Sequence, residues 1–95
     1  MDLRDLINNP SSTIVDVRTP YEFMGGKVEG SINIPLDEVS TRVEEFKSMG
    51  GNIILCCLSG NRSGMAASFL AAQGVENVYN AGGWMDVNFV KSKAA

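Results

Sequence analysis

The segment from residue 52 to residue 73 constrains the fold more than any other part of this chain. Residues 52–56 (NIILC) form its most apolar run, which is typical of a strand buried on both faces. Residues 63–73 (SGMAASFLAAQ) are rich in alanine and carry no charge, which predicts a helix buried on more than one side. A buried strand that leads through a short loop into such a helix favours an α/β fold.

The same alternation of strands and helices runs through the rest of the chain. Short β-branched or apolar runs predict further strands at 13–17, 31–34 and 77–79. Apolar spacing and capping residues predict further helices at 3–7, 20–23, 36–46 and 84–90. We therefore expect one α/β domain over residues 1–95, with a mainly parallel sheet of four to five strands between two layers of helices.

The composition excludes several kinds of site. The chain contains no histidine, so a Ser-His-Asp triad, a Cys-His dyad and any histidine-containing zinc site are excluded. Its two cysteines, Cys56 and Cys57, are too few for a four-thiolate zinc site and, being adjacent, rarely form a disulfide. We therefore expect no metal and no cofactor.

Charge and hydropathy limit the partners that this chain can have. It has 11 acidic and 8 basic residues, a balance that argues against a nucleic-acid-binding surface. No apolar run approaches the roughly 20 residues of a membrane-spanning helix, so no membrane partner is expected. Free thiols without a disulfide framework favour a reducing compartment. We expect a cytoplasmic monomer.

The loop after the most apolar strand concentrates the reactive residues. Ligands of parallel sheets bind beyond the carboxyl ends of the strands, where Cys57 lies. Gly60 and Asn61 tolerate the positive φ angles that turn backbone N–H groups toward an anion, and the next helix adds its positive end. Both effects favour the thiolate of Cys57 and make it nucleophilic without histidine. Arg62 adds a permanent cation with several donors for an oxyanion.

Four stretches of the chain, in this order, resemble signatures of the single-domain rhodanese (thiosulfate sulfurtransferase) family. The first two are IVDVR, with Glu22-Phe23 after it, and GKVEGSINIP at 26–35. The third is the loop CLSGNRS at 57–63 with its alanine-rich helix, and the fourth is NAGGW at 80–84. The resemblance covers most of the chain and implies the three-layer α/β/α fold of that family.

The resemblance also implies a reaction. Cys57 would accept a sulfane sulfur from thiosulfate or another persulfide donor and become a persulfide. It would then pass the sulfur to cyanide or to a thiol acceptor, including the thiol of a protein, in a ping-pong cycle. The substrate would be held by the loop that follows Cys57, whose backbone N–H groups would surround the outer sulfur: Leu58, Ser59, Gly60, Asn61, Arg62 and Ser63. Leu58 departs from the family pattern, because it places an apolar side chain in the loop and leaves Arg62 as the loop's only cation. Weak binding of thiosulfate is therefore expected.

Two alternatives remain open at this point. Counted from Cys56, the loop has the C-x5-R spacing of cysteine-dependent phosphatases and arsenate reductases; counted from Cys57, it has the shorter C-x4-R spacing. The strand register favours Cys57 as the nucleophile, because Cys56 continues the apolar run and is better interpreted as a core residue. The other alternative is a non-catalytic sulfur-relay or regulatory module.

Two charged residues near the first long strand are predicted to brace the loop. Asp16 ends a buried strand and must be paired or hydrogen-bonded if it is charged. Arg18 and Glu22 are four residues apart around a helix start, a spacing that allows a local ion pair. We therefore expect Asp16 and Arg18 to support the loop and not to act directly in the chemistry.

Overall fold

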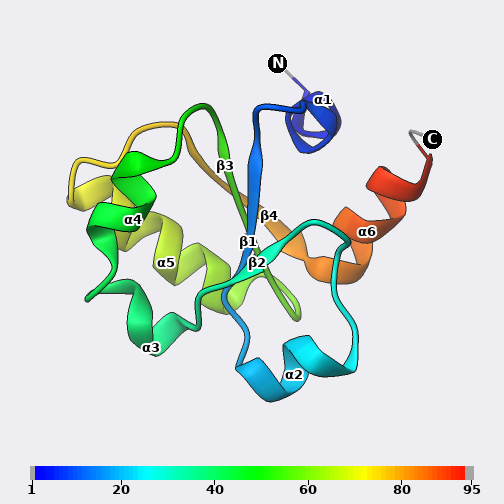
Figure 1. Ribbon diagram of the computed structural model, residues 1–95, viewed down its shortest axis with the longest axis horizontal. Coiled ribbons are helices and arrows are strands. Elements are labelled where there is room, and N and C mark those ends of the chain that lie inside the picture. Colours follow the sequence, from blue (N-terminus) through cyan, green and yellow to red (C-terminus); the bar gives the residue numbers. More distant parts are fainter. Residues whose placement is uncertain (1, 94–95) are drawn as a thin grey trace.

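The computed structural model describes residues 2–93 and contains one parallel sheet (Figure 1). Its four strands are β1 (Thr13–Asp16), β2 (Ile32–Asn33), β3 (Ile53–Cys57) and β4 (Val78–Gly83). They lie in the order β2-β1-β3-β4, and every neighbouring pair is parallel. The predicted α/β class and four-stranded parallel sheet are confirmed, and β3 is a central strand as its apolar run indicates.

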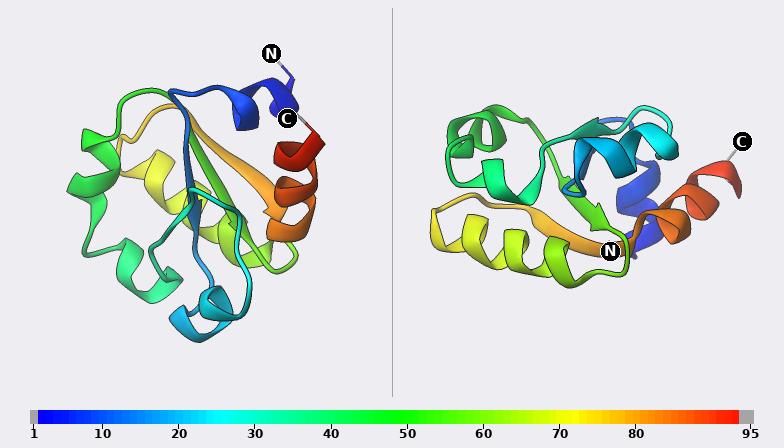
Figure 2. Two further views of the ribbon diagram at one scale, coloured as in Figure 1. Left: turned by 45° about the vertical axis from the view of Figure 1, so that its right-hand side comes forward. Right: turned by 90° about the horizontal axis from the view of Figure 1, so that it is seen from below.

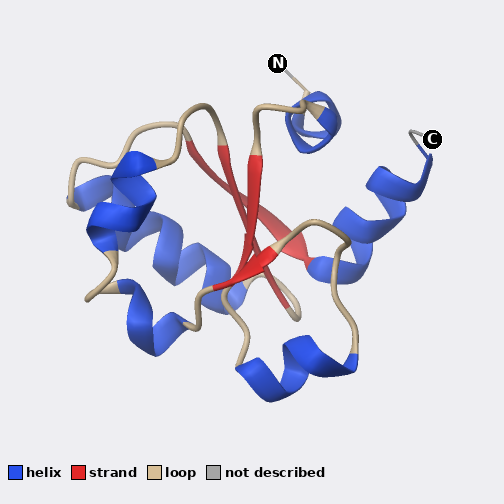
Figure 3. Ribbon diagram, viewed as in Figure 1, coloured by secondary structure: helices blue, strands red, loops and turns tan. Residues whose placement is uncertain are grey.

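Helices cover both faces of this sheet, which confirms the three-layer arrangement (Figures 1 and 3). One layer holds α3 (Leu36–Val39), α4 (Val43–Ser48) and α5 (Asn61–Ala72), and the other holds α1 (Leu3–Asn8) and α6 (Trp84–Lys93). Helix α2 (Pro20–Gly25) follows β1 and lies near the carboxyl ends of the strands, at the same end as the loop between β3 and α5 (Figure 2). Within residues 2–93, no helix has the length and apolar character needed to cross a membrane.

The two faces of β3 belong to two separate parts of the core. Leu55 and Cys57 face the layer of α3, α4 and α5, where they pack in one cluster with Phe46. Ile54 and Cys56 face the layer of α1 and α6. Successive strand residues point to opposite faces, so the adjacent cysteines lie in different surroundings although they share a peptide bond.

Two predictions about the helices are wrong. Residues 36–46 form two short helices, because the chain turns at 40–42, where the N–H groups of Thr41 and Arg42 donate to carbonyls three residues earlier and not four. Helix α5 begins at Asn61 and buries a single stripe of Ser63, Ala66 and Leu70. Its uncharged sequence therefore reflects small residues at the surface, and not burial on more than one side.

Strand β4 is longer than predicted and contains a bulge beside the central strand. Leu55 pairs with Asn80 and Cys57 with Gly83, so β4 has one more residue than β3 between these two pairs. Gly82 provides the required left-handed backbone, with φ of 84°. The bulge lies opposite Cys56, at the end of the sheet that carries Cys57.

Candidate active site

Cys57 ends β3 and lies beneath a tight loop that wraps around its sulfur. We call residues 57–63 the cysteine loop. The Gly60 N–H donates to Cys57 Sγ at 3.0 Å, and the Ser63 hydroxyl lies 3.3 Å from the same sulfur. The sulfur is therefore contacted both from the turn of the loop and from the first turn of α5.

The backbone at Gly60 makes this geometry possible. Gly60 is the N-cap of α5 with φ of 105°, a conformation that favours glycine, and a Cβ there would lie 3.3 Å from the Cα of Gly82. No side chain caps α5, so the N–H groups of its first turn stay available to the sulfur. Asn61, which could also tolerate a positive φ, does not adopt one, because it is the first residue of α5.

The loop makes the two thiols chemically different. Burial raises the pKa of the Cys57 thiol, but hydrogen bonds from the Ser63 hydroxyl and from nearby backbone N–H groups outweigh it, so the pKa lies below its ordinary value. Burial raises the pKa of the Cys56 thiol to about 12, and the charge of Asp16 adds to this effect. Of the two cysteines, Cys57 has the surroundings of a nucleophile.

This difference bears on the alternative that starts the loop at Cys56. Cys56 is fully buried among the residues that pack against α1 and α6, on the face of the sheet turned away from Cys57. A thiol with a raised pKa, on the face of the sheet opposite to the cysteine loop, does not support a C-x5-R phosphatase loop. The structure agrees with the strand-register argument for Cys57.

The Arg62 guanidinium is bound to Glu22 of α2. Its two terminal nitrogens lie 2.7 and 3.0 Å from the two carboxylate oxygens of Glu22. The same carboxylate accepts from the backbone N–H and hydroxyl of Thr19, both at 3.1 Å, within the capping box that begins α2. The bonds from Arg62 and Thr19 lower the pKa of Glu22 to about 2. The positive charge of the cysteine loop is therefore largely neutralised by a fixed carboxylate.

Arg18 does not pair with the Glu22 side chain, so that prediction is wrong. Its guanidinium instead binds Asp16, with the shortest N–O distance at 2.6 Å, and both side chains are almost completely buried. Arg18 also donates to the Gly26 carbonyl at 2.7 Å and stacks 4.6 Å from the ring centre of Trp84. These contacts hold the end of α2, and Glu22 of that helix in turn binds Arg62 of the cysteine loop.

Comparisons with known proteins identify the family of this chain. The model of the Rhodanese-like domain family matches residues 1–88. The chain belongs to the rhodanese family. It is 36% identical over 80 residues to the thiosulfate sulfurtransferase PspE of Escherichia coli, covering 83% of this chain and 77% of PspE. A solved structure described as rhodanese with anions from E. coli superimposes with a TM-score of 0.71 at 36% identity, covering 79% of this chain and 89% of that one.

Rhodanese-like domains also occur in proteins with other activities. A tRNA uridine(34) hydroxylase from Photorhabdus laumondii is 28% identical over 86 residues, which is 85% of this chain but 24% of the hydroxylase. Membership therefore places this chain in a sulfurtransferase family but does not identify its sulfur donor or acceptor.

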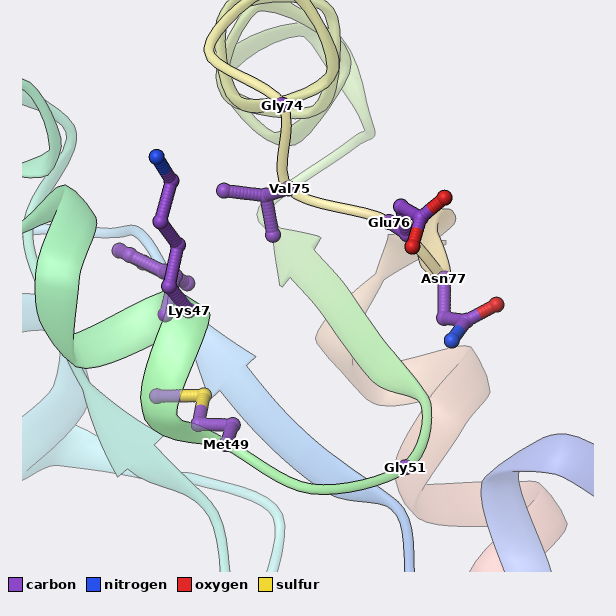
Figure 4. Close-up of a pocket in the computed structure, with 8 residues that line it drawn as sticks. Lys47, Met49, Gly51, Gly74, Val75, Glu76 and Asn77 are labelled. Atoms are coloured by element: carbon purple, nitrogen blue, oxygen red, sulfur yellow. The ribbon is translucent and has the colours of Figure 1, made fainter.

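Two pockets lie at opposite ends of the rhodanese-like sheet. A pocket of about 370 Å³ opens beside the cysteine loop, and Arg62 and Thr19 are among the residues that line it. Another of about 310 Å³ lies where β3 begins, between the ends of α4 and α5, and its lining includes Lys47 and Glu76 (Figure 4). The second is far along β3 from Cys57, whereas the first is lined by Arg62 of the cysteine loop.

The surroundings of Cys57 predict how its reactivity depends on pH. We expect iodoacetamide to alkylate Cys57 with a midpoint below that of free cysteine, and Ser63→Ala to raise this midpoint by about 0.5–1 pH unit. Alkylation rates followed by mass spectrometry measure both, and Cys56 should stay unmodified in the folded protein. A wild-type midpoint at or above that of free cysteine would contradict the assignment.

Proposed function

We propose that this domain is a sulfurtransferase that works through a persulfide on Cys57. The Cys57 thiolate attacks the outer sulfur of thiosulfate, the sulfur–sulfur bond of thiosulfate breaks, and sulfite leaves with the electron pair. The product is a Cys57 persulfide whose negative charge lies on the outer sulfur. The observation that carries the proposal is the pair of donors, Gly60 N–H and Ser63 hydroxyl, on a thiol at the carboxyl end of a parallel strand.

The second half of the cycle returns the thiolate. Cyanide or a thiolate attacks the outer sulfur, the persulfide bond breaks, and Cys57 leaves as the thiolate that the loop stabilises. The products are thiocyanate or a new persulfide on the acceptor. Neither step requires a base to deprotonate water, which fits a chain that contains no histidine.

The charges of the site favour persulfide donors over thiosulfate. Arg62 is held by Glu22, and Leu58, which is 59% exposed, presents an apolar side chain where a second cation would help a dianion. A low-molecular-weight or protein-bound persulfide carries less charge than thiosulfate and needs less compensation. We infer that such a persulfide is the better donor, with cyanide or a thiol, including a protein thiol, as the acceptor.

Production of thiocyanate from thiosulfate and cyanide tests the proposed reaction. Continuous turnover by the wild-type protein is the expected result. Formation of the Cys57 persulfide without turnover on cyanide or thiols would favour the non-catalytic sulfur-relay module instead. Cysteine-dependent release of phosphate from an aryl phosphate, without sulfur transfer, would contradict the proposal.

The Glu22–Arg62 pair predicts that kcat/KM for thiosulfate falls when the arginine is replaced and rises when the glutamate is replaced. Arg62→Ala should lower kcat/KM for thiosulfate by about tenfold, mainly through KM, because it leaves the Glu22 carboxylate facing an anionic donor. Glu22→Gln should raise it by about three- to tenfold, because it removes the charge that neutralises Arg62. Steady-state kinetics at low salt measure both variants, and thermal unfolding checks that each is folded. Unchanged kcat and KM in Arg62→Ala would show that Arg62 does not bind the donor.

A further inference from the structure

Asn80 lies in β4, outside the cysteine loop, but its side chain contacts that loop at two places. Its amide nitrogen donates to the Gly60 carbonyl at 3.1 Å, and its amide oxygen lies 2.7 Å from the Ser63 hydroxyl. The same oxygen accepts from the Gly82 N–H at 3.0 Å, within the bulge of β4. One exposed side chain thus joins both residues that contact Cys57 Sγ to the edge of the sheet.

The contacts fix which end of the amide is the oxygen. The Gly82 N–H is a donor and requires an acceptor, and the Gly60 carbonyl is an acceptor and requires a donor. Turning the amide over would break both bonds at once. The group that faces the Ser63 hydroxyl is therefore an oxygen, so the hydroxyl must be the donor in that contact.

The Ser63 hydroxyl has one proton but two acceptors within reach. Asn80 Oδ1 lies at 2.7 Å and Cys57 Sγ at 3.3 Å, so the proton can point to only one of them at a time. A hydrogen bond to a charged acceptor is about twice as strong as one to a neutral acceptor. The direction of this proton therefore depends on whether the negative charge is on the Cys57 sulfur.

We propose that Asn80 is a positioning residue of this site. It holds Gly60 in place, and its amide oxygen accepts the hydrogen bond from the Ser63 hydroxyl whenever Cys57 Sγ carries no charge. The proposal rests on the proposed function. In the thiolate, Ser63 donates to the sulfur, and Asn80 Oδ1 keeps its bond from Gly82. Once the persulfide has formed, its charge lies on the outer sulfur, and Ser63 turns to Asn80. The hydroxyl therefore follows the charge through the cycle without leaving a buried donor unpaired.

Asn80→Asp tests the link through Ser63 with almost no change in shape. The added carboxylate competes for the Ser63 proton and repels the Gly60 carbonyl, so the alkylation midpoint of Cys57 should rise by about one pH unit. In a Ser63→Ala background the same change should have less than half of that effect, because the hydroxyl that connects the two groups is absent. Asn88→Asp, the same change on the exposed face of α6, is the matched control and should leave the midpoint unchanged.

The link to Gly60 is tested with a variant that adds no charge. Asn80→Ala removes the donor to the Gly60 carbonyl, so hydrogen exchange of the Gly60 amide should become about fivefold faster or more. NMR measures this exchange, and a correctly folded variant keeps its other amide signals. This measurement also decides the matter if Asn80→Asp does not fold.

Two results would overturn the role of Asn80. One is an equal shift of the alkylation midpoint by Asn80→Asp with and without Ser63. The other is unchanged exchange of the Gly60 amide in Asn80→Ala. Neither readout involves sulfur transfer, so a wild-type protein that forms no persulfide would refute the proposed function and leave these two measurements valid.

Discussion

Cys57→Ser should abolish thiocyanate formation, with a loss of at least about a thousandfold. A serine oxygen in the same loop cannot become a persulfide, and no other group takes over a covalent step of this kind. Cys57 is also buried, but the Gly60 N–H and the Ser63 hydroxyl that contact its sulfur can bond to the new serine oxygen, so the variant should unfold close to the wild-type temperature. Turnover with thiosulfate and cyanide, measured beside a thermal unfolding curve, checks both expectations.

Cys56→Ser is the matched control for that variant, because it makes the same chemical change one residue earlier. Cys56 is fully buried on the other face of β3, so the new hydroxyl should lower the free energy of unfolding by about 1–3 kcal/mol. Turnover of the folded fraction should stay within about twofold of wild type. Loss of turnover in Cys56→Ser, with Cys57→Ser still active, would show that Cys56 is the nucleophile and that the assignment to Cys57 is wrong.

The second large effect concerns stability. Arg18→Ala should lower the free energy of unfolding by about 3–5 kcal/mol, because it leaves the completely buried Asp16 side chain without its main partner. It also removes the bond to the Gly26 carbonyl and the stacking on Trp84. Urea denaturation measures the loss, which is a large part of the stability of a small domain.

The control for Arg18→Ala is an arginine whose ion pairs are exposed. Arg42→Ala breaks the bonds of Arg42 to Glu38 and Glu45 on the surface of α3 and α4, and should cost no more than about 1 kcal/mol. Equal losses in the two variants would show that the buried pair contributes no more than a surface pair. The account of how α2 is held in place would then be wrong.

The parts of the fold that follow from local pattern were predictable. The apolar run at 52–56 identified the central strand, and its register distinguished Cys56, as a core residue, from Cys57 at the strand's end. Thr19 and Pro20 marked the start of α2 correctly, and the capping box there includes Glu22. These features depend on neighbours within a few residues.

Contacts between distant residues could not be predicted in the same way. Glu22 and Arg62 are 40 residues apart, and the prediction paired Glu22 with the nearer Arg18 because only local spacing was visible. Asn80 was noticed only as part of a signature, because its contacts depend on a bulge in β4 that shifts the register by one residue. Both are side-chain contacts that form only when α2, α5 and β4 meet at one end of the sheet.

The central claim is that Cys57 carries the transferred sulfur, and intact-mass spectrometry tests it most directly. The protein is treated with thiosulfate or a low-molecular-weight persulfide, and the excess donor is removed. Its intact mass is then measured under non-reducing conditions, and a peptide map locates any added sulfur. We expect the mass of one sulfur atom on Cys57 in the wild type and in Cys56→Ser, absent from Cys57→Ser and removed by cyanide. Added sulfur on Cys56, or no added sulfur with either donor, would contradict the account.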